Sequence, residues 1–232
     1  MTATPPPSPG VRVTYFLEVN SSWCYWAEPT WAELRRRHEG TVAFEWKIAQ
    51  MKAADYPTSR EQCDWFYRRS GLLMRSPFRL NSGWFEPELI HEGMIAAPNR
   101  VAEAARALGC TGDEVRLALS HAAERDGRRT LRLDVAVEVA VAAAPDRLDP
   151  AELRARAEAP ETAARIRATT DEFYAHQISQ RPAFVLESAI GDKAVFSGLV
   201  HLAPLEATIA ALQADAAGYA AHAAHHGPPP AA

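Results

Sequence analysis

A short stretch near the N-terminus, residues 13–29, constrains the fold more than any other part of the chain. It begins with the run Val-Thr-Tyr-Phe-Leu, whose β-branched and aromatic residues are typical of a buried strand. Ser21 and Ser22 follow, and serine is a preferred residue at the N-cap of a helix. A helical pattern then runs to about residue 38. The sequence therefore predicts a strand that passes directly into a helix, with Ser21, Ser22 and Cys24 at the turn.

Such a turn favours anions, because the free backbone N–H groups and the positive end of the helix dipole point toward it. Ser21 has two interpretations: a simple helix cap, or a hydroxyl that donates to a substrate sulfur or oxyanion. A serine without a nearby base is a poor nucleophile, and no histidine lies near it in the sequence. Cys24 also has two interpretations: a small buried hydrophobe, or a thiol whose pKa is lowered by the helix terminus.

Composition excludes several classes of protein. The net charge of −4 comes from interspersed charges of both signs, which gives no electrostatic footprint for nucleic acid. No run of about 18 apolar residues exists, so we expect no membrane span. Residues 1–10 are rich in proline and lack the apolar segment of a secretory signal. Cys24, Cys63 and Cys110 are too few and scattered for a disulfide framework, and we expect the last two in the core. These features predict a cytoplasmic protein.

The order of the predicted elements falls into three blocks. Strands over residues 11–19 and 41–48 flank the first helix and predict a parallel pair with a right-handed crossover. Helical patterns fill residues 57–179, apart from an irregular aromatic segment, and include one helix over residues 87–108. Two strands follow, at 182–187 and 194–197 around a hairpin turn, and a closing helix begins near residue 204.

The motif Ser21-Ser22-Trp23-Cys24-Tyr25 resembles the active-site segment of the DsbA-like branch of the thioredoxin superfamily. There a strand runs into Cys-x-x-Cys-Tyr at the head of a helix, so that Ser21 replaces the first cysteine. The kappa-class glutathione transferases and the 2-hydroxychromene-2-carboxylate isomerases are similar at this point and also carry a serine. The resemblance covers roughly residues 11–215.

This resemblance implies an α/β protein with a thioredoxin fold, βαβ followed by ββα, split by a large all-helical insertion. Residues 11–56 and 180–220 then form the thioredoxin-like domain and residues 57–179 the insertion. We expect disorder in residues 1–10 and 221–232. The resemblance also implies that Pro182 is a cis-proline facing the first helix, since cis bonds are almost wholly a proline phenomenon. The backbone of Arg181 would then pair with an extended thiol ligand.

The same resemblance implies a site with glutathione or another low-molecular-weight thiol as cofactor and no metal. Ser21 and Cys24 are the expected catalytic residues. The expected binding residues are Ser22, Trp23, Tyr25, Trp84, Arg181 and Pro182. Aromatic residues of the first helix and of the insertion suit a flat or aromatic ligand if they line a cleft. Arg75, Arg79 and Asn81 lie among them and either anchor a carboxylate or stay on the surface.

Three functions follow: a glutathione-dependent transferase or isomerase that uses Ser21, a monothiol oxidoreductase that uses Cys24, and a binding protein that has lost the redox pair. Kappa-class transferases carry a Ser-Asp pair after the final strand. The matching residues 196–201 lack the acid, which weakens the case for a glutathione-dependent transferase or isomerase. We expect a small-molecule substrate and no nucleic-acid or membrane partner, and a homodimer is compatible with the sequence.

Overall fold

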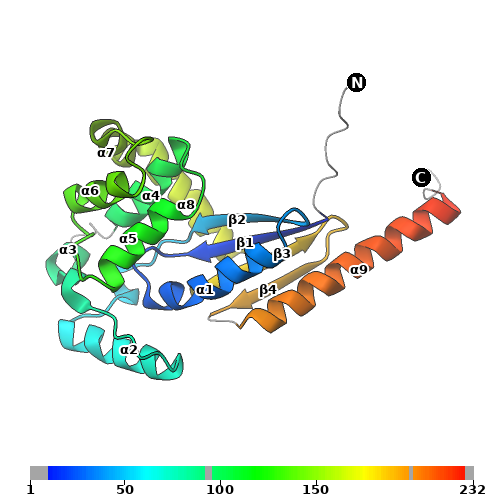
Figure 1. The fold of residues 1–232 in the computed structure, drawn as a ribbon, viewed down its shortest axis with the longest axis horizontal. Coiled ribbons are helices and arrows are strands. Elements are labelled where there is room, and N and C mark those ends of the chain that lie inside the picture. The colour runs from blue at the N-terminus through cyan, green and yellow to red at the C-terminus, as the bar shows by residue number, and fades with distance from the viewer. Residues whose placement is uncertain (1–9, 92–95, 199–200, 228–232) are drawn as a thin grey trace.

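A four-stranded sheet organises the protein in this computed structural model, which describes residues 10–91, 96–198 and 201–227 (Figure 1). The strand order is β2-β1-β3-β4. The bounds are Val11–Leu17 for β1, Val42–Ile48 for β2, Ala183–Ser188 for β3 and Lys193–Ser197 for β4. β1 pairs parallel with β2 and antiparallel with β3, and β3 pairs antiparallel with β4. This arrangement confirms the predicted thioredoxin fold.

The alternation of side chains along β1 divides the core between the two faces of the sheet. On one face, Val13, Tyr15 and Leu17 pack with the buried residues of α1 (Ser22–Arg37) and of α9 (Leu202–His226). Phe16 points the other way and packs against Phe173 of α8 (Pro160–Ala175), with ring centroids 5.8 Å apart. The sheet is therefore covered by helices on both faces, which explains why every residue of its central strand from Val13 to Leu17 is buried.

The insertion between β2 and β3 contains only helical elements among its described residues, as predicted. It packs around α4, which contacts α5, α6, α7 and α8. The range 87–108 holds two helices, α3 and α4, and residues 92–95 between them lie outside the description. The elements are η1 Ala53–Asp55, α2 Arg60–Leu73, η2 Ser82–Trp84, α3 Pro87–His91, α4 Ala97–Ala107, α5 Glu114–Glu124, α6 Leu133–Ala143, α7 Pro150–Glu158 and α8.

The last helix is longer than the sequence pattern predicts. α9 continues to His226, so the expectation of disorder from residue 221 is wrong as far as that residue. Its alanine-rich sequence has high helix propensity, which sustains the helix after its packing ends. The buried residues of α9 are Leu205, Ile209 and Leu212, and the rest of the helix projects away from the sheet (Figure 1). The predicted disorder of residues 1–9 and 228–232 falls outside the described part of the chain.

No helix in the described ranges is long and apolar enough to cross a bilayer.

Candidate active site

Ser21 occupies the N-cap of α1, between the end of β1 and the first helical turn. Its backbone is extended, and its Oγ accepts the backbone N–H of Cys24 at 3.4 Å. No acidic residue lies in the first turn of α1. Ser21, and not Ser22, therefore caps the helix, and its hydroxyl sits where the helix dipole favours negative charge.

Ser21 lines two adjoining cavities. The first, which we call the outer cleft, has a volume of about 470 Å³. The second, the inner pocket, has a volume of about 190 Å³ and continues into the insertion. The two share Ser21, Trp23, Met51, Asp55 and Arg69. The outer cleft adds Ser179, Gln180, Arg181 and Gly198, and the inner pocket adds Asn20, Ser22, Tyr56, Pro57, Cys63, Phe66, Tyr67 and Trp84.

The segment before β3 closes the outer cleft opposite α1. The Arg181–Pro182 peptide bond is cis, as predicted. Arg181 lines the cleft and Ser21 lines it from α1, which agrees with the expected juxtaposition of the two segments. The guanidinium of Arg181 points into the fold: it donates to the carbonyl oxygens of Ala49 and Gln50 and lies 4.3 Å from the ring centroid of Phe173. Its backbone N–H and C=O make no bond to another described backbone group.

Cys24 lies beneath the site and not in it. Its side chain is buried, its Sγ accepts the backbone N–H of Glu18 at 3.4 Å, and it lines neither cavity. Burial raises the pKa of Cys24 to about 12, which favours the first of its two interpretations, a small buried hydrophobe, over a thiol whose pKa is lowered by the helix terminus. Desolvation of the thiolate outweighs the hydrogen bonds from Glu18 and Ser21, which lower the pKa. Cys63 and Cys110 are also buried, as predicted, and all three thiols are free.

Some of the predicted binding residues come together and others do not. Ser22 and Trp84 line the inner pocket, and Trp23 lines both cavities. Tyr25 lines neither; its ring packs edge-on against Trp26 and His121, with centroids 5.1 and 5.7 Å away.

The carboxylate anchors suggested by the sequence lie elsewhere. Arg75, Arg79 and Asn81 are absent from the described lining of both cavities. Asn81 instead caps η2 through the backbone N–H of Gly83. The cation that does line both cavities is Arg69, which the sequence analysis missed because only the fold brings α2 beside α1.

Two fully buried glutamates also escaped the sequence analysis. Glu18 accepts the side-chain N–H of Asn99 at 2.6 Å and the backbone N–H of Met51 at 2.8 Å, and burial raises its pKa to about 7. Neither carboxylate oxygen of Glu124 has a hydrogen-bond partner in the described structure, and burial raises its pKa to about 8. A local sequence pattern does not predict that an acidic residue is buried, so Glu18 and Glu124 were identified only from the fold.

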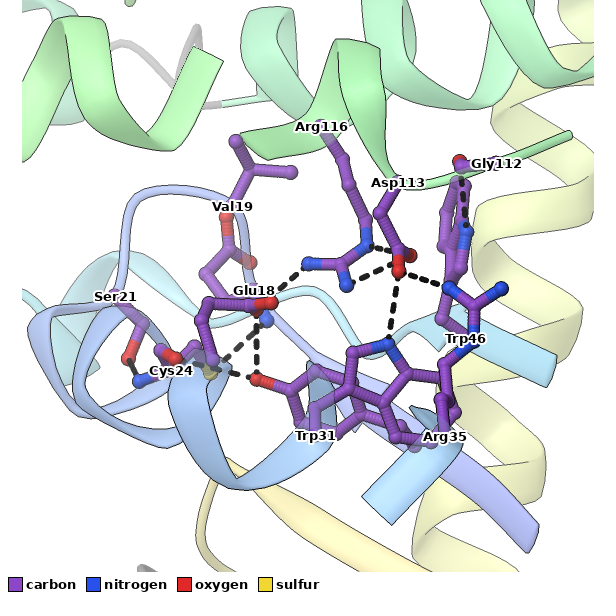
Figure 2. Close-up of polar contacts among 12 residues, drawn as sticks. Glu18, Val19, Ser21, Cys24, Trp31, Arg35, Trp46, Gly112, Asp113 and Arg116 are labelled. Atoms are coloured by element: carbon purple, nitrogen blue, oxygen red, sulfur yellow. Dashed lines mark hydrogen bonds and ion pairs between the residues drawn. The ribbon is translucent and has the colours of Figure 1, made fainter. Parts of the chain in front are cut away.

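A buried ion pair holds α1 against the insertion. Arg116 of α5 donates to Glu28 at 2.6 Å and to Asp113 at 2.9 Å. Asp113 also accepts from Trp31 and Arg35 of α1, and Figure 2 shows these side chains converging from the two elements. The contacts fix the helix that carries Ser21 relative to the insertion that supplies the inner pocket.

Similar folds occur among solved structures, although no protein-family model and no curated protein matches the sequence. A candidate protein disulfide isomerase from Nitrosomonas europaea superposes with a TM-score of 0.69 at 14% identity, covering 88% of this chain and 98% of that one. A candidate DsbA oxidoreductase from Streptomyces coelicolor gives 0.64 at 18% identity, covering 88% and 90%. The cytosolic disulfide reductase DsbM from Pseudomonas aeruginosa gives 0.63 at 19% identity, covering 80% and 89%. The chain therefore has the DsbA-like thioredoxin fold.

Proposed function

We propose that the protein is a glutathione-type, thiol-dependent transferase or isomerase that holds the ligand thiolate at Ser21. The observation that carries this proposal is the placement of the Ser21 hydroxyl. It lines both cavities, and its proton has no acceptor among the described residues. Together with the N–H groups of the first turn of α1, it forms a preorganised donor set for a thiolate.

The burial of Cys24 argues against the monothiol oxidoreductase, and the hydroxyl of Ser21 argues against a dithiol oxidant. A monothiol oxidoreductase needs an accessible thiolate, whereas Cys24 lines neither cavity and has a pKa of about 12. A dithiol oxidant needs a second thiol at the helix terminus, where this chain has the hydroxyl of Ser21. The nucleophile is then the sulfur of the ligand, which reacts as a thiolate after releasing its proton to solvent. In a transferase the C–S bond forms as the leaving group departs with its bonding electrons. In an isomerase the thiolate adds to a C=C bond whose electron pair moves onto a conjugated carbonyl, and after rotation the C=C bond forms again and expels the thiolate.

The inner pocket supports a small apolar or aromatic second substrate. The rings of Tyr56, Phe66, Tyr67 and Trp84 line it and offer an apolar surface beside the polar side chains near Ser21. Trp84 is locked in place, since its Nε1–H donates to the Tyr67 hydroxyl at 2.6 Å. An electrophile seated there lies beside the thiol held at Ser21, because both cavities share that residue.

Glutathione is the thiol favoured by the comparison with DsbM, which has a solved structure with glutathione at 18% identity and a TM-score of 0.62 to this chain. The metal-free assignment is retained, and no group of three potential metal ligands occurs in the described residues. We also retain a cytoplasmic location, in keeping with three free thiols, and a homodimer as the form to test in solution.

The test compares Ser21→Ala with Cys24→Ser in a glutathione-binding assay and in glutathione conjugation to an aromatic halide. Loss of one donor from a preorganised anion site costs about 10²–10³ in rate. We expect Ser21→Ala to lose that factor and Cys24→Ser to keep most activity with lower stability. The reverse order would identify the monothiol oxidoreductase, and a wild-type protein that binds glutathione without turnover would identify the binding protein.

A further inference from the structure

Arg69 is held at the junction of the two cavities by three aromatic rings. Its Cζ lies 5.1 Å from the ring centroids of Trp65 and Phe66, both on α2, and 5.9 Å from that of Trp23 on α1. Cations within about 6 Å of a ring centroid are attracted by the ring quadrupole. The guanidinium is therefore ordered beside the site although the residue is exposed.

The charge of Arg69 is not neutralised within the described structure. No carboxylate there lies within ion-pair distance of it, whereas Arg132 and Arg116 each pair with an acid. Arg181, the other cation in the outer cleft, already donates to two carbonyl oxygens. Arg69 is thus the cation of the cleft whose donors are available to a ligand.

The remaining lining of the outer cleft leaves room for an anionic group at Arg69. Asp55 is the one acid among its described lining residues, and one of its oxygens accepts the backbone N–H of Lys52 at 2.9 Å. The N-terminus of α1 adds positive potential, with no acid in its first turn. A ligand with a sulfur at Ser21 and a carboxylate at Arg69 would match this distribution of donors.

We propose that Arg69 binds a carboxylate of the ligand thiol, which makes the site selective for low-molecular-weight thiols that carry a carboxylate. This inference rests on the proposed function, because it takes the ligand sulfur to lie at Ser21. The guanidinium presents a planar fork that matches a carboxylate. The three rings hold that fork in place before the ligand arrives, so less side-chain freedom is lost on binding.

The experiment measures binding of glutathione and of its diethyl ester, which lacks both carboxylates, by isothermal titration calorimetry. Four proteins are compared: the wild type, Arg69→Gln, Arg69→Lys and the control Arg68→Gln. Arg68 is an exposed neighbour on the same helix and lines neither cavity. Loss of a hydrogen bond to a charged group corresponds to about a tenfold to hundredfold change in affinity.

We expect the wild type and Arg68→Gln to bind glutathione tighter than the ester by about that factor. Arg69→Gln should bind glutathione more weakly by that factor and should bind the ester with unchanged affinity. Arg69→Lys should recover part of the lost affinity for glutathione. Equal binding of the two ligands by the wild type, or equal losses for both in Arg69→Gln, would overturn the inference.

A parallel titration of Ser21→Ala separates this failure from failure of the proposed function. One outcome is that Ser21→Ala weakens the binding of both ligands while Arg69→Gln changes the affinity for glutathione no more than that for the ester. In that case the thiol site stands and the carboxylate assignment is wrong. A wild-type protein that binds neither ligand would overturn both.

Discussion

Single side chains decide what the site at Ser21 does. Ser21 and Cys24 lie three positions apart but differ in their accessibility to a ligand as well as in their chemistry. The Ser21 hydroxyl lines two cavities, whereas the Cys24 thiol is buried under the first turn of α1. The motif alone left the protonation state of Cys24 open. Burial favours the neutral thiol, since desolvation is the largest cause of its raised pKa.

Substitution of Ser21 by cysteine tests the alignment with the Cys-x-x-Cys motif. We expect Ser21→Cys to form a disulfide with Cys24 under mild oxidation, because a helix N-cap and the third helical residue of this motif bring two thiols within bridging range. Loss of two free thiols per chain by mass spectrometry would detect the bond. The matched control is Ser22→Cys, one residue further along the helix, which should stay reduced. A Ser21→Cys protein that keeps all its thiols would contradict the alignment.

Glu124 predicts a pH dependence of stability. Burial raises its pKa from 4.5 to about 8, so the folded state holds its proton more tightly than the unfolded state. The contribution is present in full below pH 4.5 and is lost as the pH rises to about 8, on the order of 5 kcal/mol. Urea denaturation at pH 5 and pH 9 should show a smaller fall in unfolding free energy for Glu124→Gln than for the wild type. The exposed Glu138→Gln should retain the wild-type fall.

At the level of helices and strands, sequence periodicity predicted most of what is observed. The strand before Ser21, the helix after it and the switch to strands at Pro182 all follow from local pattern and capping chemistry. Local pairing was less predictable: Ser59 accepts the backbone N–H of Gln62 at 3.2 Å, and the Gln62 side chain accepts the backbone N–H of Thr58 at 2.6 Å. Arg69 and Glu18 acquire their surroundings only when distant segments meet, so no local pattern identifies them.

The pairing of α5 with α1 predicts a large effect of one substitution. Arg116→Met should destabilise the protein by about 3–5 kcal/mol, because it leaves the buried carboxylate of Glu28 without its cation. Thermal unfolding measures the loss, and hydrogen exchange in the first turn of α1 should quicken. The double variant Arg116→Met with Glu28→Gln should recover part of the loss. If the single and double variants were equally unstable, side-chain packing and not the ion pair would hold the two helices together.

The stability of the whole fold depends on only the first part of α9. Deletion of residues 214–232 should leave the melting temperature nearly unchanged, because the buried residues of α9 end at Leu212. Deletion from residue 204 onward removes Leu205, Ile209 and Leu212 from the core and should prevent folding. Circular dichroism during heating distinguishes the two truncated proteins. A large loss in the shorter deletion would mean that the projecting half of α9 is covered in solution, which analytical ultracentrifugation would reveal as self-association.

The sheet order has a consequence for synthesis on the ribosome. β1 acquires its β2 neighbour soon after it is made, but its other neighbour, β3, begins only at Ala183. At about 5–20 residues per second, the central strand waits roughly ten to thirty seconds with one edge open. Open edges of apolar strands are templates for aggregation. The nascent chain therefore passes through an interval in which a chaperone has most to protect. That interval ends when β3, directly after the segment carrying Arg181, pairs with the open edge of β1.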